Sequence, residues 1–414
     1  MAGDPAHDYT ARYSVELAQE YLTMPPENRY PSVPFLHAAA KKRLPKFSYD
    51  YVNGGTGPGV GQERNRTALD AVTMTPRYVT QTGPVETEVE VFGRKFARPF
   101  GIAPMGLASL QVPDAELKFA RAAKAADMPV GLSTACTVDI EEFGAIAGSN
   151  GWFQLYPPKD EAVNDDLIKR ASDAGFGAMF VTVDVPASGW RPHDAYNGLA
   201  VPPRITPATI WNAAMRPCWS LSTLAAGIPH FKTLGRYSPD KSMRGMADFV
   251  STQLGNPTSA DRLKRIRDLW KGDLIIKGVM HPADAEAAID MGYNGILVSN
   301  HGGRQLDAAP ASIEVLSEIV DVVGDKAMVM ADSGFSSGLD ILRALAIGAK
   351  FVFCGRAFMW GLAAMGPAGV PHVINMLSDE LERSLIQIGC PRLSELDRSW
   401  LSDHPRQTRY PNAR

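Results

Sequence analysis

The sequence of 414 residues has few cysteines and no excess of charge of one sign. Its four cysteines lie far apart and form no C-x-x-C pair, which argues against a disulfide framework or a cysteine zinc site, so no metal site is predicted. With 42 basic and 45 acidic residues, the formal net charge is -3. No global positive field is therefore available to hold nucleic acid, and no nucleic-acid partner is expected. The cysteines are Cys136, Cys218, Cys354 and Cys390.

Long apolar runs are also missing. No stretch approaches the roughly 18 consecutive apolar residues of a membrane span. The first ten residues are polar and include Asp4 and Asp8, which does not match a signal peptide. The composition, 45% hydrophobic and 21% charged, is that of an ordinary globular protein. We therefore expect a soluble cytoplasmic enzyme.

From residue 99 onward, eight short apolar runs alternate with helix-like segments. The runs are apolar on both faces, which is typical of strands covered by helices. Several of the intervening segments end in glycine, as at Gly292 and Gly348, a usual helix stop. Eight such units over about 250 residues predict an α/β fold with a single (β/α)8 TIM barrel. A doubly wound sheet is the alternative, but no switch point is evident. The runs cover residues 99–103, 128–132, 152–155, 178–183, 274–276, 295–298, 327–330 and 351–353.

Three regions fall outside this repeat. Residues 1–98 form an N-terminal lead-in that we expect to pack on the barrel of residues 99–390, and residues 391–414 form a C-terminal tail. Residues 204–256 interrupt the fourth unit, and an excursion of this length is typical of a lid or an interaction loop. The insertion has six basic and two acidic residues with Trp211, Trp219 and Phe231, which would suit a membrane surface. Its prolines break any long amphipathic helix, so a soluble lid or subunit contact is favoured.

Polar residues follow the ends of the predicted strands, where the active sites of such barrels lie. Lys277 ends the fifth strand, and burial of its charge would require a compensating anion such as a reduced flavin. The glycine-rich ends of strands seven and eight each open a helix, which predicts a phosphate site on backbone N–H groups, with Arg356 as a bidentate donor. We therefore expect a redox cofactor that carries a phosphate.

His301 and Arg304 lie three residues apart in a glycine-rich turn, so both can face one small ligand. A guanidinium matches the two oxygens of a carboxylate. An imidazole can take a proton from a neighbouring hydroxyl, and Asp184 on the fourth strand could orient it. This pattern predicts a carboxylic acid substrate with an adjacent hydroxyl. The alternative is a loop histidine that bonds only to backbone.

The nonapeptide SNHGGRQLD at residues 299–307 is close to a family signature. Together with LPKFSYDY at 44–51, FQLY at 153–156, TVD at 182–184 and IKG at 276–278, it resembles the FMN-dependent α-hydroxy acid oxidase and dehydrogenase family, over residues 35–400. The resemblance implies an FMN cofactor and oxidation of L-2-hydroxy acids to 2-oxo acids. The segments SGWRP at 188–192 and DSG at 332–334 look most like lactate 2-monooxygenase.

This resemblance implies O2 as the acceptor, giving either H2O2 or coupled oxidative decarboxylation of a lactate-like substrate. A quinone-linked lactate or mandelate dehydrogenase is the alternative. A non-redox barrel that binds flavin or a sugar phosphate is a third hypothesis, against which the His-x-x-Arg pair argues. A homo-oligomer of four or eight subunits is expected, and a membrane partner is not.

The resemblance also implies residue roles. His301 is the catalytic base, oriented by Asp184; Tyr156 bonds the hydroxyl side of the substrate; and Arg304, Tyr51 and Arg191 hold its carboxylate. Ser336 stands where the family usually has an arginine beside the phosphate, and Ala135 where glycolate oxidase has an aromatic residue. The residues implied to contact FMN are Pro104, Met105, Gly106, Ser133, Gln154, Thr182, Lys277 and Ser299, with Asp332, Ser333, Gly334, Ser336, Gly355 and Arg356 around its phosphate.

Overall fold

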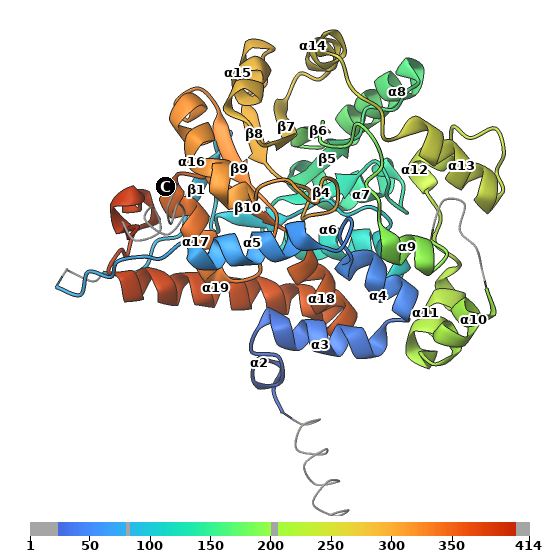
Figure 1. Cartoon of the computed structure of the whole chain (residues 1–414), viewed down its shortest axis with the longest axis horizontal. Helices are drawn as coiled ribbons and strands as arrows, with labels where there is room; N and C mark the ends of the chain where they lie inside the picture. Colours follow the sequence, from blue (N-terminus) through green and yellow to red (C-terminus); the bar gives the residue numbers. More distant parts are fainter. Residues whose placement is uncertain (1–23, 80–82, 200–205, 403–414) are drawn as a thin grey trace, which may run out of the picture.

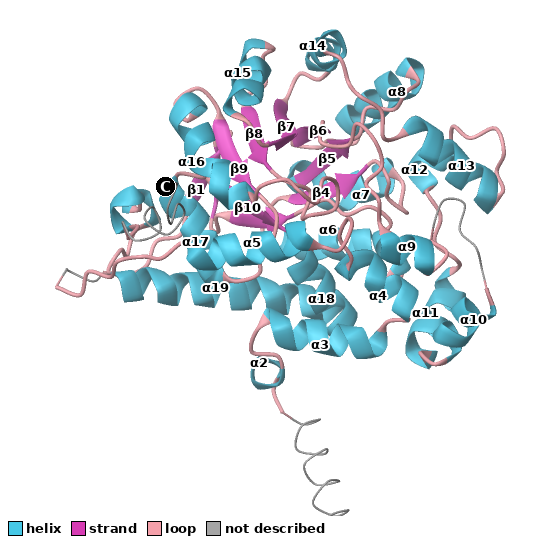
Figure 2. Cartoon of the chain, in the orientation of Figure 1, coloured by secondary structure: helices cyan, strands magenta, loops and turns pink. Residues whose placement is uncertain are grey.

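Eight parallel strands form a closed barrel in the computed structural model, which describes the chain apart from residues 1–23, 80–82, 200–205 and 403–414 (Figure 2). The barrel closes where Val352 of the last strand pairs with Phe100 of the first. This closure confirms the predicted TIM barrel and excludes a doubly wound sheet. The strands are β3 (Phe100–Ile102), β4 (Val130–Ser133), β5 (Gly151–Leu155), β6 (Ala178–Thr182), β7 (Asp273–Val279), β8 (Gly295–Val298), β9 (Met328–Ala331) and β10 (Phe351–Cys354).

Aromatic side chains fill the barrel at the amino ends of its strands. Trp152, Phe180 and Phe353 pack together inside it, with ring centroids 5.2 to 5.4 Å apart. A hairpin of β1 (Val89–Val91) and β2 (Arg94–Phe96) adds Phe96, which packs against Phe351 at 6.1 Å. Because this end is plugged by large apolar rings, a ligand site is left to the opposite end, at the carboxyl termini of the strands.

Helices surround the barrel (Figure 1). The predicted glycine stops are present, since Gly292 and Gly348 follow helices with φ of +86° and +125°. By length and composition, an 18-residue window within the run Arg356–Ile388 is apolar enough to cross a membrane. However, 67% of that window is buried inside the protein. The helices are α6 (Ala115–Ala125), α7 (Ile140–Ala147), α8 (Glu161–Asp173), α14 (Ala260–Leu269), α15 (Pro282–Asp290), α16 (Ser312–Val323), α17 (Gly338–Ile347), α18 (Arg356–Met365) and α19 (Gly369–Ile388).

The described part of the lead-in forms α2 (Pro26–Arg29), α3 (Val33–Arg43), α4 (Lys46–Asn53) and α5 (Val60–Ala71). Helix α3 packs along α18. The amides of Asn65 on α5 and Asn300 after β8 exchange two hydrogen bonds, of 2.9 and 2.7 Å. The N–H of Thr56 donates to the carbonyl of Gly303 at 3.0 Å. The lead-in therefore fixes the loop that follows β8. Its first 23 residues, and the tail from residue 403, lie outside the described residues.

Between β6 and α14, the residues that the structure describes form five short helices. Pro207 and Pro217 each stand at the first position of a helix, where the missing N–H costs nothing, so the prolines divide the segment as expected. The helices are α9 (Pro192–Tyr196), α10 (Pro207–Ala214), α11 (Pro217–Ala226), α12 (Lys232–Gly235) and α13 (Met243–Gln253). Residues 204 and 205 of the predicted insertion lie outside the described residues.

Helix α11 is fastened to the barrel on its inner side. The indole N–H of Trp219 donates to the carbonyl of Leu110 at 3.2 Å, and its ring meets Phe47 edge-on at 5.5 Å. On the outer side, large apolar side chains of α10, α11 and the turn after α11 are between 54% and 73% exposed. We call this set the apolar face; it comprises Ile210, Trp211, Met215, Leu221, Leu224 and Ile228.

Candidate active site

A cavity of about 760 Å³ opens at the carboxyl ends of the strands. Its volume lies within the usual range for small-molecule and cofactor sites. Of the insertion, only Leu254 and Gly255 line it among the described residues, so the expected lid reaches the cavity only near its carboxyl end. The predicted site residues that line the cavity are Tyr51, Pro104, Met105, Gly106, Gln154, Tyr156, Arg191, Lys277, His301, Arg304, Asp332, Ser333, Gly334, Ser336, Gly355 and Arg356.

Four predicted residues do not line the cavity but stand directly behind it. Thr182 accepts a hydrogen bond from the Gln154 amide at 2.7 Å, and Ser299 accepts one from Lys277 at 2.8 Å. Ser133 accepts one from the backbone N–H of Ala135 at 3.2 Å. Asp184 bonds His301, as described next. All four hold side chains or loops that face the cavity.

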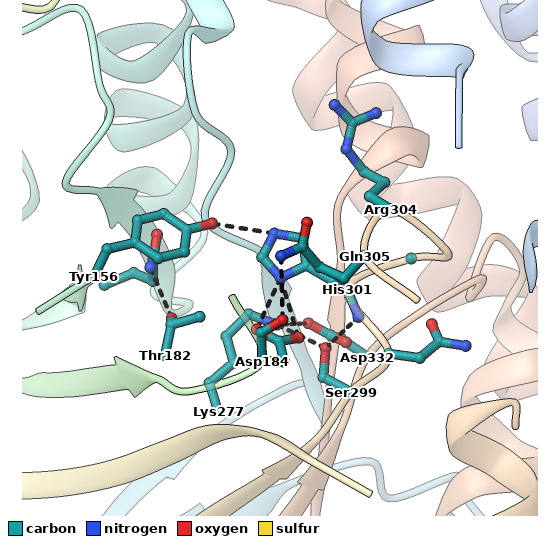
Figure 3. Close-up of polar contacts among 12 residues, drawn as sticks. Tyr156, Thr182, Asp184, Lys277, Ser299, His301, Arg304, Gln305 and Asp332 are labelled. Atoms are coloured by element: carbon teal, nitrogen blue, oxygen red, sulfur yellow. Dashed lines mark hydrogen bonds and ion pairs between the residues drawn. The ribbon is translucent and has the colours of Figure 1, made fainter. Parts of the chain in front are cut away.

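His301 is held from both ring nitrogens (Figure 3). Its Nδ1 lies 3.1 Å from each carboxylate oxygen of Asp184, and its Nε2 lies 3.1 Å from the hydroxyl of Tyr156. The residue has φ of +60°, a conformation that a non-glycine residue rarely adopts and that is often found at functional sites. The turn thus directs Nε2 toward Tyr156 and the cavity, as a base requires.

The electrostatics of this triad favour a neutral phenol and an ionised carboxylate. Burial alone would raise the pKa of Asp184, but the charge and hydrogen bond of His301 and the charge of Lys277 lower it below the usual value. Asp184 therefore stays a carboxylate and can hold a proton on Nδ1, which leaves Nε2 free to accept one. Burial and the charge of Asp184 raise the pKa of Tyr156, so its hydroxyl remains a donor.

Three guanidinium groups reach the cavity without an equal number of carboxylates. Burial and the charge of Arg191 lower the pKa of Arg304 to about 10, and burial with the charges of Arg304 and Arg191 lowers that of Arg356 to about 9. Arg191 lies 3.8 Å from Asp194, a distant partner. Because the three cations destabilise one another, anionic ligands are favoured in this cavity.

Arg304 extends away from His301 in Figure 3, toward the lead-in. Its Nη1 donates to the carbonyls of Tyr51 and Gly54, both at 2.7 Å, and its guanidinium lies 5.2 Å from the Tyr51 ring centre. The Tyr51 hydroxyl donates to the carbonyl of Gly106 at 3.2 Å. The backbone carbonyls thus hold Nη1 of the guanidinium, and its other N–H groups are left for a ligand.

The anion that balances the charge of Lys277 is not the one expected, which was a cofactor. Its Nζ lies 2.6 Å from Asp332 and the side chain is buried, so a carboxylate of the chain itself balances the charge. The sequence did not indicate this pair because the two residues lie on β7 and after β9. The same ammonium remains in the wall of the cavity, which the amide of Gln154 also lines.

The loop after β9 carries small side chains apart from Phe335, which also lines the cavity. Ser333 and Gly334 have φ of +86° and +92°, and the Ser333 hydroxyl accepts hydrogen bonds from the N–H groups of Asn300 and Gly302. Ser336 bonds Asp340 through its N–H at 3.0 Å. With Gly355 and Arg356 after the neighbouring strand β10, this end suits a phosphate, and the wall with Lys277 and Gln154 suits a polar ring system. The residues present therefore fit FMN.

Several residues of the site were not predicted. Asn65 and Asn300 support the loop of His301, and His37, Trp360 and Leu254 line the cavity. Asn300 lies within the nonapeptide and could have been found there. The others lie on the lead-in, the last barrel helix and the insertion, where no motif marks them.

Comparison with known proteins gives a consistent result. The family described as "FMN-dependent dehydrogenase" matches residues 40–403. An L-lactate dehydrogenase of Caulobacter sp. (strain K31) is 38% identical over 368 residues, which cover 88% of this chain and 96% of that protein. A 4-hydroxymandelate oxidase of Amycolatopsis orientalis is 38% identical over 361 residues, covering 87% and 95%. A crystal structure described as the monotopic membrane protein (S)-mandelate dehydrogenase superposes with a TM-score of 0.86 at 34% identity, covering 90% and 98%.

Proposed function

The chain belongs to the FMN-dependent dehydrogenase family, and from that premise we propose that it oxidises small L-2-hydroxy acids to 2-oxo acids and passes the electrons to a membrane quinone. That it is an FMN-dependent 2-hydroxy acid oxidoreductase follows from the family and its relatives. The observation that carries the proposed chemistry is the triad of Tyr156, His301 and Asp184 in a cavity rich in guanidinium groups.

The residues divide the reaction between binding and proton transfer. Arg304 and Arg191 bind the substrate carboxylate, since guanidinium donors match its two oxygens. Tyr156 donates a hydrogen bond to the hydroxyl oxygen that becomes the carbonyl oxygen. Nε2 of His301 takes one proton, and Asp184 stabilises the resulting imidazolium. The C–H and O–H bonds break as the C=O bond forms, and bound FMN would supply the acceptor for the two electrons and the second proton.

The apolar face supports a membrane acceptor. Its six large side chains are exposed on α10, α11 and the turns that follow them, and exposed apolar patches mark interaction sites. Full burial of one such side chain is worth about 1.5–3 kcal/mol. A relative of similar structure is described as a monotopic membrane protein. On this proposal the chain works at a membrane surface rather than free in the cytoplasm, in contrast to the sequence-based expectation.

Direct reaction with O2 is the second candidate. The segment of residues 188–192 meets the end of the insertion at the cavity, where a Cβ on Gly255 would lie 3.3 Å from the Ser188 hydroxyl. Segments that close over a cavity retain the product, and a retained 2-oxo acid could react with H2O2 to give CO2, water and a shortened acid. A relative is named as an oxidase. This observation favours an oxidase or a 2-monooxygenase.

One experiment separates the acceptors. The FMN-loaded protein is given a panel of L-2-hydroxy acids in air, with and without vesicles that contain a quinone, and flavin bleaching, 2-oxo acid, O2, H2O2 and CO2 are measured. The proposal expects quinone reduction without O2 consumption. Free H2O2 equal to 2-oxo acid indicates an oxidase, and CO2 equal to O2 without H2O2 indicates a monooxygenase. Absence of bleaching by every acid contradicts the proposed chemistry.

The predicted homo-oligomer of four or eight subunits stays a prediction. Sedimentation of the loaded protein in detergent and in its absence would measure the subunit number.

A further inference from the structure

The phosphate end of the cavity has one fixed cation. Among the described lining residues near the β9 and β10 loops, Ser333, Ser336 and Gly355 are neutral and Arg356 is charged. Arg356 already donates to the carbonyls of Val52 and Gly302, at 3.0 and 2.8 Å. A phosphate monoester carries about -1.5 to -2 charges near neutral pH. A single guanidinium therefore leaves close to one negative charge unmatched.

The other fixed cations of the cavity are committed elsewhere. Lys277 pairs with Asp332 at 2.6 Å, and Arg304, which the carbonyls of Tyr51 and Gly54 hold in place, is assigned to the substrate carboxylate. Arg191 lies near Asp194, on the side of the substrate. The one further group of the described lining that can gain a positive charge, apart from the base His301, is His37.

His37 is fixed in position at this end of the cavity. Its Nε2 lies 2.7 Å from the Tyr49 hydroxyl, and its ring stacks on Trp360 with centroids 4.6 Å apart and planes at 28°. Trp360 lies one helical turn after Arg356 on α18, so the imidazole that stacks on Trp360 lies beside the first turns of that helix, where the charge of Arg356 reaches it. The mechanism described above does not use His37.

We propose that His37 is the second cationic group at the FMN phosphate and that it becomes protonated when the cofactor binds. The proposal rests on the placement of the phosphate at the β9 and β10 loops. It explains how a cradle with Ser336 and one arginine can hold a dianion, because an imidazolium on α3 supplies the missing charge.

The groups around His37 make its charge dependent on the ligand. Burial, with the charges of Lys41 on its own helix and Arg356 on α18, lowers the pKa of His37 in the free protein, while a hydrogen bond to Asn53 raises it. Tyr49 on α4 has a raised pKa because of burial and Asp50, so it remains neutral. Glu63 on α5 is exposed at the rim. A phosphate dianion would raise the pKa of His37, and FMN binding should then take up a proton.

The test compares FMN with riboflavin, which lacks the phosphate. Apoprotein is titrated with each flavin from mildly acidic to mildly alkaline pH, and proton uptake is measured by calorimetry in buffers of different ionisation enthalpy. We expect His37→Gln to weaken FMN binding about ten-fold, the size of one charge-assisted contact, and to abolish the proton uptake. Riboflavin binding should not change. The second ionisation of the phosphate, with a pKa of about 6, affects both proteins equally.

Three variants complete the design. His372→Gln is the matched control, because His372 bonds the carbonyl of Tyr30 at 2.9 Å, away from the cavity lining, and should bind FMN as the parent does. Arg356→Gln should weaken FMN but not riboflavin; if it does not, the phosphate lies elsewhere and the placement itself is wrong. Ser336→Arg in the His37→Gln protein should restore FMN affinity without restoring proton uptake.

Two results would overturn the role of His37. Unchanged FMN affinity and proton uptake in His37→Gln would show that the imidazole carries no charge at the phosphate. An equal loss of FMN and riboflavin affinity would show that His37 supports the fold through Tyr49 and Trp360 instead.

Discussion

The catalytic triad and the apolar face differ in where their partners lie. Tyr156, His301 and Asp184 are held by one another, and each hydrogen bond of the imidazole ends within the chain. The apolar face shows the opposite arrangement, because Leu221 and Leu224 are 68% and 73% exposed on a helix whose inner side is fastened. The hydrogen-bonded triad therefore informs us about the reaction, whereas the exposed apolar side chains inform us about a surface that the protein binds.

The largest effect is expected at the triad. His301→Gln should leave FMN bound but slow flavin reduction by about 10²–10⁴-fold, since an amide cannot accept the proton that Nε2 takes. Stopped-flow bleaching of the flavin by L-lactate or L-mandelate measures this. His281→Gln, at the exposed start of α15, is the control. A near-normal reduction rate in the His301 variant would remove His301 from the role of base.

A second change tests the binding half of the site. Arg304→Lys should lower kcat/KM for flavin reduction by about 10²-fold, because an ammonium cannot make a bidentate contact and a charged hydrogen bond is worth about 1.5–3 kcal/mol. The lysine would also lose the bonds to the carbonyls of Tyr51 and Gly54. Arg191→Lys serves for comparison. Wild-type kinetics for Arg304→Lys, with a large loss for Arg191→Lys, would move the carboxylate to Arg191.

The apolar face should matter for the acceptor and not for the chemistry. Replacing Leu221 and Leu224 by serine should weaken binding to quinone-containing vesicles by at least about ten-fold, since each leucine forfeits part of about 1.5–3 kcal/mol of burial. Flavin reduction by a soluble hydroxy acid should not change. Ile386→Ser removes a side chain of 52% exposure on α19 and is the matched control. Unaltered vesicle binding by the leucine variant would contradict a membrane role.

The barrel was predictable because its strands are buried on both faces. The apolar runs gave all eight strands, and the glycine stops gave helix ends. The pattern failed at β7, which runs from Asp273 to Val279 although the apolar run covers only 274–276. Lys277 and Gly278 continue the strand with an irregular register, and Gly278 has φ of +100° where a Cβ would meet Asp184 at 2.5 Å. Tertiary contacts, and not hydrophobicity, extend this strand.

The candidate site was predictable in its members and less so in its pairings. Strand-end position, the nonapeptide and the family resemblance identified residues that lie in one cavity or directly behind it, while their individual roles stay predictions. The pair of Lys277 with Asp332 and the approach of His37 to Trp360 could not be inferred, because each joins residues far apart in sequence. The insertion was predicted as a lid or a subunit contact, and that role stays a prediction; its prolines start separate helices as expected, and among its described residues Leu254 and Gly255 line the cavity.

The smallest expected effect concerns the inner side of α11, where the helix that carries part of the apolar face contacts the rest of the chain. Trp219→Phe removes the indole N–H that donates to the carbonyl of Leu110 but keeps an aromatic ring against Phe47. The carbonyl retains the hydroxyl of Ser48 as a donor at 3.0 Å, so no buried acceptor is left unsatisfied. The free energy of unfolding should fall by about 1 kcal/mol, the net worth of one hydrogen bond, measured by the denaturant midpoint.

Trp211→Phe, on the 68% exposed outer side, should leave stability unchanged. Vesicle binding should survive in the Trp219 variant, because the outer leucines are intact. A loss of stability with vesicle binding retained would show that the inner side of α11 stabilises the fold while its outer side binds the membrane. Unchanged stability would show that the Trp219 hydrogen bond does not hold α11 in place.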